Sequence, residues 1–253
     1  MSAITLTLRV PLDGQLDLDG ILPERTADLD ETAIAALPVS LASRACALGD
    51  LFTVRGERSA HLTFEGDLAR AVRVGAGMGT GRIDVVGDVG DAAGMAMSGG
   101  VLRVSGNAGD RLCAAVPGAS KGMTGGEAIV LGSAGSEAGA RCRRGLIVVG
   151  GDAGPQVARD IIAGTVVVGG RTGAEPGRRN KRGSIVALGG IDVPPTYRYA
   201  CTYDPPYVRL LMTYLRKTYA MAIPDSTRSS RYRRYCGDAG DPGKGEILER
   251  VDA

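Results

Sequence analysis

The chain has 253 residues, 44% hydrophobic and 23% charged, which is typical of a folded globular protein rather than a disordered one. Its single histidine and its five scattered cysteines, with no CxxC pair, argue against multi-histidine metal sites, Ser–His–Asp catalysis and a disulfide framework. The net charge of +2 hides an acidic first quarter and a basic remainder. Acidic residues near the start and the lack of a long apolar run predict a cytoplasmic protein without a membrane span.

Residues 1–60 are expected to cap the part of the chain that follows. Residues 4–10 alternate apolar and polar side chains, the pattern of a strand with one buried face. A short helix is predicted over 31–37, with Asp30 as its N-cap. A second strand is predicted over 52–56. A cap of this kind protects an open sheet edge from aggregation.

The central region, residues 61–193, repeats one short phrase seven times: an apolar run that ends in a glycine. Successive anchor glycines stand 19 to 26 residues apart, most often 19, and five of the seven have another glycine three residues later. The anchors are Gly66, Gly87, Gly106, Gly132, Gly151, Gly170 and Gly190. A period near 19 is too short for pairs of helices. It predicts an all-β fold, a right-handed parallel β-helix of about seven glycine-rich coils.

The positions within each run predict which side chains face inward. Residues four and two before each anchor are apolar and are expected to form two interior ladders, which places Val186 inside and Ala187 outside in the last repeat. The outward position between the ladders is polar in the first three repeats (Thr63, Asp84, Arg103) and apolar in the later ones. Because an apolar sheet face must be covered, we expect the C-terminal segment or a partner protein to lie on it.

A basic stretch lies within 138–182, with nine Arg or Lys side chains against three Asp or Glu. Aligned by repeat, Arg141, Asp160 and Arg179 fall at the same position of consecutive coils, which predicts a structural ion-pair ladder. Other cations have no acidic neighbour in this alignment and are candidates for an anion-binding track. These are Arg143, Arg144, Lys181 and Arg182. A solvated face or a contact between subunits is the alternative explanation.

Residues 194–253 differ in character from the repeats, and all eight tyrosines lie there. A helix is predicted over 207–220, where apolar side chains recur on one stripe and are expected to cap the last coil or cover the apolar outer face. A basic, tyrosine-rich tail follows over 228–235. Interleaved Arg and Tyr are found in nucleic-acid-binding proteins. The same composition is typical of protein interfaces, which is the interpretation we favour.

Several motifs resemble active-site sequences but lack the necessary context. Residues 75–81 resemble a dinucleotide fingerprint, yet a predicted strand rather than a helix follows them. Residues 118–122 lack the Gly-Lys-Ser/Thr ending of a phosphate loop. His61 begins a strand, and no pair of carboxylates recurs at a spacing suited to acid–base catalysis. We therefore expect no catalytic site and no metal site on this chain.

The glycine-rich coils and the insert Pro117-Gly-Ala-Ser-Lys-Gly-Met-Thr-Gly-Gly126 resemble the GXGXG domain. That domain is shared by the C-terminal domain of glutamate synthase and by the C subunit of formylmethanofuran dehydrogenase. The resemblance covers about residues 60–200, and the later Gly-Asp and Gly-Lys-Gly-Glu segments favour the formylmethanofuran branch. The excess of Arg over Lys, with abundant Ala and Gly, is typical of bacteria. It favours the family of the C subunit of the bacterial formyltransferase/hydrolase complex.

This resemblance implies a non-catalytic scaffold subunit that works in the one-carbon metabolism of methylotrophy. The complex moves a formyl group from tetrahydromethanopterin to methylofuran and releases formate. Its partners would be the hydrolase (A), B and formyltransferase (D) subunits, with zinc expected only in the hydrolase and no nucleic acid or membrane involved. The furan cofactor has a polyglutamate tail, so the basic track, together with Lys121 of the insert, could make charge-assisted hydrogen bonds to its carboxylates.

Two alternatives remain open from the sequence. The chain could be the C subunit of a tungsten or molybdenum formylmethanofuran dehydrogenase, or a stand-alone module that binds an acidic ligand or nucleic acid. Co-purifying proteins distinguish these cases. A zinc hydrolase and a transferase indicate the first hypothesis, a molybdopterin protein with iron–sulfur chains the second, and a lone chain the third.

Overall fold

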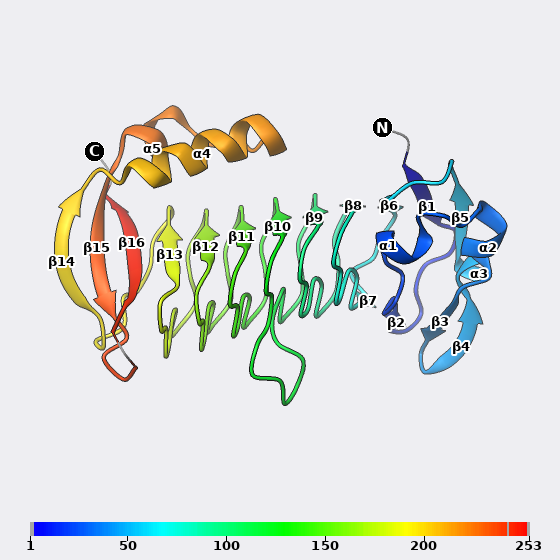
Figure 1. The fold of residues 1–253 in the computed structure, drawn as a ribbon, viewed down its shortest axis with the longest axis horizontal. Coiled ribbons are helices and arrows are strands. Elements are labelled where there is room, and N and C mark those ends of the chain that lie inside the picture. Colours follow the sequence, from blue (N-terminus) through cyan, green and yellow to red (C-terminus); the bar gives the residue numbers. More distant parts are fainter. Residues whose placement is uncertain (1–2, 242, 252–253) are drawn as a thin grey trace.

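The computed structural model describes residues 3–241 and 243–251, the side chains of residues 228 and 229 excepted. As predicted, the protein is mostly β-sheet: a mixed sheet of 12 strands runs along the elongated body, and a 4-stranded sheet lies at its N-terminal end (Figure 1). Within the described residues, no helix combines the length and the apolar character needed to cross a membrane.

The seven predicted apolar runs all form strands, and each pairs in parallel with the next one along the chain. They are β6 (His61–Glu65), β8 (Arg82–Val86), β9 (Val101–Val104), β10 (Glu127–Val130), β11 (Leu146–Val149), β12 (Thr165–Val168) and β13 (Ser184–Ala187). A second row of parallel bridges joins the first six of these repeats further along, from Leu68 to Thr172. We call each repeat a rung of this stack.

The N-terminal region adds strands ahead of the first rung. β1 (Ile4–Leu8) pairs in parallel with β6, and β5 (Phe52–Arg55) ends the sheet by antiparallel pairing with β1. The predicted helix is confirmed as α2 (Glu31–Ala35): the side chain of Asp30 accepts a hydrogen bond from the backbone N–H of Ala33 at 2.8 Å. The other elements here are β2 (Leu16–Asp17), α1 (Pro23–Thr26), β3 (Pro38–Leu41), β4 (Arg44–Ala47), α3 (Leu48–Leu51) and β7 (Ala71–Val72).

The C-terminal region also extends the large sheet. Its elements are β14 (Arg198–Tyr203), α4 (Pro206–Tyr219), α5 (Asp225–Ser229), β15 (Arg231–Gly237) and β16 (Gly245–Val251). α4 confirms the predicted helix, but the segment of residues 228–235 described as a tail overlaps β15. β16 pairs in parallel with β13, while β15 and β14 follow in antiparallel order. The strands form because Ile247 of β16 is buried in the core of the stack and Leu248 is buried on its other side.

The interior of the stack holds the predicted apolar ladders except in the last rung. There Ile185 and Ala187 are buried in the interior and Val186 faces outward, so the placement of Val186 inside was wrong. The prediction counted from Gly190, whereas Gly189 packs on the backbone of Gly169 and Gly170 and is the equivalent glycine. Side chains alternate along a strand, so a shift of one residue exchanges its two faces.

Close approach between rungs explains several repeat glycines. A Cβ on Gly106 would lie 2.7 Å from the carbonyl oxygen of Gly87, and one on Gly169 would lie 2.1 Å from that of Gly150. Neither glycine has a positive φ. Positive φ occurs at other repeat glycines, such as Gly66 with φ of 125°, and at non-glycine corner residues such as Arg141, with φ of 58°.

α4 covers the apolar outer face of the late rungs, as predicted for the C-terminal segment. Figure 1 shows the helix lying along the outside of the sheet above β10 to β13. Its buried stripe consists of Val208, Met212, Leu215 and Tyr219. The sheet residues beneath it are Ile129, Val148, Val167, Val186 and Leu248. Removing this apolar face from water is what holds the helix on the sheet.

Candidate functional site

The five predicted cations lie together on one corner of the stack. We call them the basic track: Lys121, Arg143, Arg144, Lys181 and Arg182. All five side chains are exposed, and within the part of the chain that the structure describes they make no hydrogen bond or ion pair.

Backbone hydrogen bonds fix the register of this corner. The N–H of Arg143 donates to the carbonyl oxygen of Met123 at 2.8 Å. In the next two rungs, the N–H of Ile162 donates to the carbonyl oxygen of Cys142 at 2.8 Å, and the N–H of Lys181 donates to the carbonyl oxygen of Ile161 at 2.9 Å. Arg143, Ile162 and Lys181 therefore occupy the same position on three consecutive rungs. Because adjacent strands lie about 4.8 Å apart, Arg143 and Lys181 are separated by about 10 Å along the stack.

The insert carries Lys121 to the same corner. It leaves the stack as the long loop between β9 and β10 in Figure 1. The guanidinium of Arg141 donates to the carbonyl oxygen of Ala119 at 2.7 Å, and the N–H of Gly122 donates to that of Arg141 at 2.8 Å. These contacts place Lys121 beside the turn that carries Arg143.

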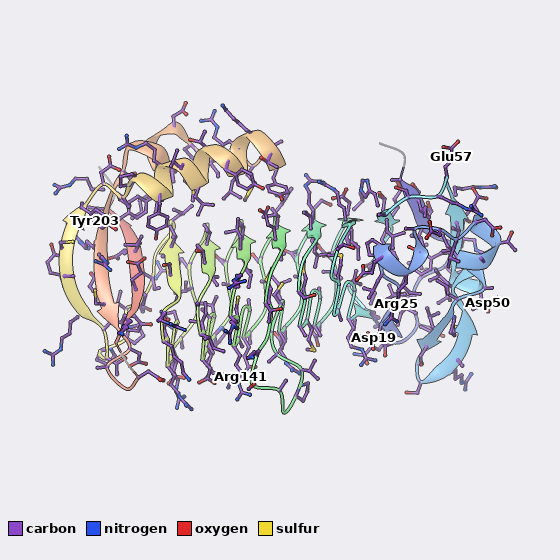
Figure 2. The ribbon with its side chains drawn as sticks, in the orientation of Figure 1. Asp19, Arg25, Asp50, Glu57, Arg141 and Tyr203 are labelled. Atoms are coloured by element: carbon purple, nitrogen blue, oxygen red, sulfur yellow. The ribbon has the colours of Figure 1, made fainter. Side chains whose placement is uncertain are left out.

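The predicted ion-pair ladder is confirmed next to the basic track. The carboxylate of Asp160 lies 3.7 Å from Nε of Arg141 and 3.2 Å from Nε of Arg179. The sequence alignment missed Arg159, which approaches Asp160 at 3.8 Å and pairs with Glu137 at 3.0 Å. Figure 2 shows Arg141 at the edge of the stack. These arginines are partly neutralised, which leaves the basic track as a source of unpaired positive charge at this corner.

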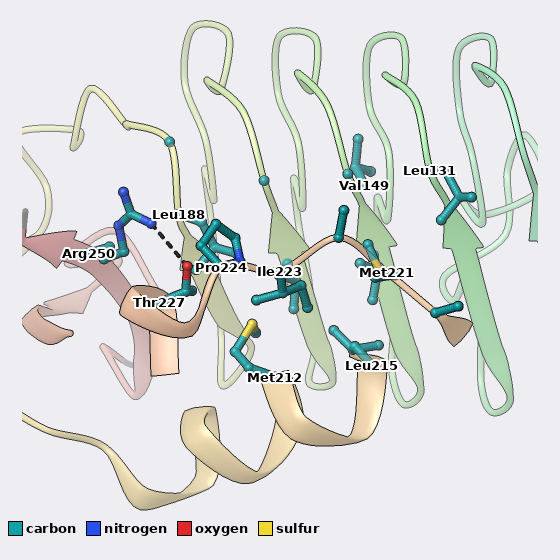
Figure 3. A pocket seen from close by; sticks show the side chains of 17 residues that line it. Leu131, Val149, Leu188, Met212, Leu215, Met221, Ile223, Pro224, Thr227 and Arg250 are labelled. Carbon is teal, nitrogen blue, oxygen red and sulfur yellow. Dashed lines mark hydrogen bonds between the residues drawn. The ribbon is translucent and has the colours of Figure 1, made fainter. Parts of the chain in front are cut away.

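A cavity of about 480 Å³ lies between the outer face of the sheet and the segment that joins α4 to α5 (Figure 3). Leu131, Leu188 and Ile223 are among its apolar walls, and glycines leave bare backbone on its floor. At one end Arg250 donates to Oγ1 of Thr227 at 3.1 Å. None of the lining residues is His, Cys, Asp or Glu, so the cavity can hold an apolar group but offers no general acid, base or thiol nucleophile.

The single histidine belongs to a small ionic cluster on the outer face. Nε2 of His61 lies 2.6 Å from Asp84, and Arg82 donates to both oxygens of the same carboxylate at 2.8 Å. Burial raises the pKa of Asp84, but the hydrogen bonds from Arg82 and His61 outweigh it, so the pKa lies below its ordinary value of 3.8. The carboxylate therefore stays ionised at neutral pH and serves as an ion-pair partner.

The thiols and acidic groups give little basis for catalysis. Burial raises the pKa of Cys142 to about 12, so this thiol is protonated at neutral pH and is a poor nucleophile. Among residues 3–241 and 243–251, no group of three His, Cys, Asp or Glu side chains could hold a metal ion. The basic track is the feature best suited to bind a ligand, and the ligand it suits is an anion.

No family model matches the chain. The C subunit of the formyltransferase/hydrolase complex Fhc of Methylorubrum extorquens is 40% identical over 86 residues, which is 34% of this chain and 32% of that relative. This match thus spans about a third of the relative's length.

A solved structure matches over nearly the whole chain. It is the crystal structure of the formyltransferase/hydrolase complex (FhcABCD) from Methylorubrum extorquens in complex with methylofuran. One of its chains is 34% identical to this protein, and the match covers 98% of this chain and 100% of that chain with a TM-score of 0.82.

The protein is a repetitive β-sheet protein, and one corner of its stack carries five exposed cations. Within that class, the similarity extends over the full length of a solved chain at an identity that indicates common descent. The protein belongs to the family of the C subunit of the formyltransferase/hydrolase complex. This confirms the resemblance inferred from the glycine repeats and the insert of residues 117–126.

Proposed function

We propose that this chain is the non-catalytic scaffold subunit of a formyltransferase/hydrolase complex, assembled with hydrolase (A), B and formyltransferase (D) subunits. Such a complex transfers a formyl group from tetrahydromethanopterin to methylofuran and releases formate in one-carbon metabolism. The observation that carries the proposal is the full-length match, at a TM-score of 0.82, to a chain of FhcABCD. The chemistry would reside on the partners, because the described residues of this chain offer no metal cluster.

A scaffold role requires a rigid body, and the stack has the features of one. We propose that residues 61–193 form a right-handed parallel β-helix of seven coils, flanked by a cap region of residues 1–60 and by residues 194–253. The parallel strands and the second row of bridges support this arrangement. Seven coils at about 4.8 Å span roughly 30 Å. Because each coil is hydrogen-bonded to the next, partners bound at different coils would be held at fixed separations.

The basic track suits the polyglutamate tail of the furan cofactor. Its five cations are exposed, and the ionic ladder of Asp160 neutralises the neighbouring arginines rather than these. The spacing of about 10 Å between Arg143 and Lys181 lets separate carboxylates of one extended chain meet separate cations. The neutral residues Ile162 and Ala163 lie between them on the middle rung.

Co-purification tests the assembly. A tag on this chain, expressed in its own cells at native level, is expected to recover a hydrolase, a B subunit and a formyltransferase in fixed ratios, together with formate-releasing activity. Recovery of a molybdopterin protein with iron–sulfur chains would favour the dehydrogenase alternative. Recovery of the chain alone, or bound to nucleic acid, would contradict the scaffold role.

Charge removal tests the track within the intact complex. Arg144→Gln with Arg182→Gln is expected to weaken binding of polyglutamylated methylofuran by about 10-fold at low salt, since each exposed charge contact contributes up to about 1 kcal/mol. The loss should shrink as salt is added. A matched control, Arg44→Gln with Arg58→Gln, removes the same charge from exposed sites in residues 1–60. Equal affinities for the two double variants would contradict the assignment.

A further inference from the structure

α4 carries a second apolar stripe that the sheet does not cover. We call it the outer stripe: Tyr207, Leu210 and Tyr214. Leu210 is 71% exposed, and Tyr207 and Tyr214 are 38% and 39% exposed. The solvent side of a surface helix is normally polar, and single exposed apolar residues are common. Three large side chains at i, i+3 and i+7 form a continuous surface instead, and these are positions by which a helix docks into an apolar groove. Leu211, at i+4, is half-buried against the cluster beneath α4.

The two tyrosines at the ends of the outer stripe are held in place. The hydroxyl of Tyr214 donates to Glu127 of β10 at 2.9 Å, and the hydroxyl of Tyr207 donates to Glu246 of β16 at 3.4 Å. Both rings are therefore fixed against the sheet while part of their surface stays exposed. Binding through fixed side chains loses less conformational entropy, and tyrosine is enriched among residues that dominate interface energies.

The charges of α4 indicate what kind of surface fits the outer stripe. Lys217 lies two turns after Leu210 on the same side, is exposed, and has no ion pair among the described residues. Arg209 and Arg216 point elsewhere and each pair with an aspartate. α4 contains no acidic residue. In a two-fold contact between copies of this chain, Lys217 of each copy would find no carboxylate on α4 of the other, which disfavours self-association through this surface.

We propose that the outer stripe docks another subunit of the complex, one that presents an apolar groove with carboxylates on its rim. Leu210 would enter the partner's groove, the rings of Tyr207 and Tyr214 would pack against its walls, and Lys217 would pair with the carboxylates on its rim. This inference rests on the proposed function, because it requires that the chain assemble with other subunits.

Leu210→Glu tests the docking surface, with Val86→Glu as the matched control. Both variants replace an exposed apolar side chain by a carboxylate, and Val86 lies on β8 rather than on α4. The full-length Leu210→Glu chain, tagged and purified from its own cells, should bind its partner at least about 30-fold more weakly, as expected for a central interface residue. Val86→Glu should retain it. The exposed position of Leu210 predicts unchanged circular dichroism and melting for the isolated chain.

Photo-crosslinking identifies the occupant directly. With p-benzoylphenylalanine in place of Tyr214, illumination of the assembled complex is expected to yield an adduct with a different subunit, at apolar residues flanked by Asp or Glu. An adduct between two copies of this chain would overturn the proposal, and so would full partner retention by Leu210→Glu. If the unmodified chain recovers no partner, the proposed function fails and the inference with it. If it recovers partners that Leu210→Glu also recovers, the docking surface alone is refuted.

Discussion

Gly169→Ala tests whether neighbouring rungs are in contact through their glycines. A Cβ on Gly169 would lie 2.1 Å from the carbonyl oxygen of Gly150, about 1 Å inside the closest approach that real Cβ atoms make. The obstructing atom belongs to the backbone. The N–H of Gly169 also donates a hydrogen bond to the carbonyl oxygen of Val149 in the preceding rung, at 2.8 Å. The contact can be relieved only if two rungs separate locally. Overpacking usually costs about 1–3 kcal/mol, and we expect the upper end, about 3 kcal/mol.

Equilibrium urea denaturation of the isolated chain, followed by far-UV circular dichroism, measures this loss. For a chain of this length, about 3 kcal/mol corresponds to a decrease in Tm of about 6–12 °C. Gly79→Ala is the matched control, because its Cβ would meet only side-chain atoms, at 3.4 and 3.6 Å, and its φ is not positive. It should leave stability unchanged or raise it by about 0.5 kcal/mol. Equal stabilities of the two variants would refute the close packing of the rungs.

Three further changes probe the ion pairs and the helix. Asp160→Asn removes the carboxylate shared by Arg141 and Arg179, and a loss of about 2 kcal/mol is expected in urea denaturation; a change below about 0.5 kcal/mol would contradict the ladder. The pKa of Asp84 is lowered in the folded chain, so its ion pairs stabilise the protein above about pH 4 and the stabilisation is lost as the pH falls through that lowered pKa. Asp84→Asn should weaken this acid dependence, and identical pH–stability curves would argue against it. Leu215→Ala deletes a fully buried contact under α4 and should cost about 2–5 kcal/mol by thermal melting, whereas no loss would mean that the helix does not cover the sheet.

The repeats were predictable because one physical constraint recurs in each of them. Rungs approach so closely that only glycine fits at certain points, and the resulting period is visible in the amino-acid sequence. The same period aligned Arg141, Asp160 and Arg179 correctly. It failed in the last rung, where the adjacent Gly189 and Gly190 offer two choices of anchor, and only packing against Gly169 distinguishes them.

The C-terminal strands could not be predicted by the same means. β15 begins Arg-Tyr-Arg-Arg-Tyr and lacks regular alternation, and β16 has only the short apolar pair Ile247 and Leu248 between charged residues. What makes these segments strands is the open edge of β13, which lies about 60 residues earlier in the chain. Arg159 was missed because the repeat alignment compares only equivalent positions of different rungs. Arg159 is the residue directly before Asp160 and pairs with it within the same rung.

The exposure of the basic track also depended on the structure. The sequence indicated which cations lack an acidic neighbour in the repeat alignment, and the structure places all five on the surface at one corner. The position of Lys121 follows from the contacts of the insert with Arg141, which no spacing rule predicts. The outer stripe of α4 was partly visible, because Tyr207 and Tyr214 are in the predicted helix but lie outside its buried stripe.

The most direct test of the scaffold role is an electron cryo-microscopy map of the assembly purified through a tag on this chain. We predict that the stack lies between at least two other subunits and contacts them through different faces, the outer stripe among them. A map in which this chain touches one partner at its periphery, or in which it purifies with no partner, would contradict the account.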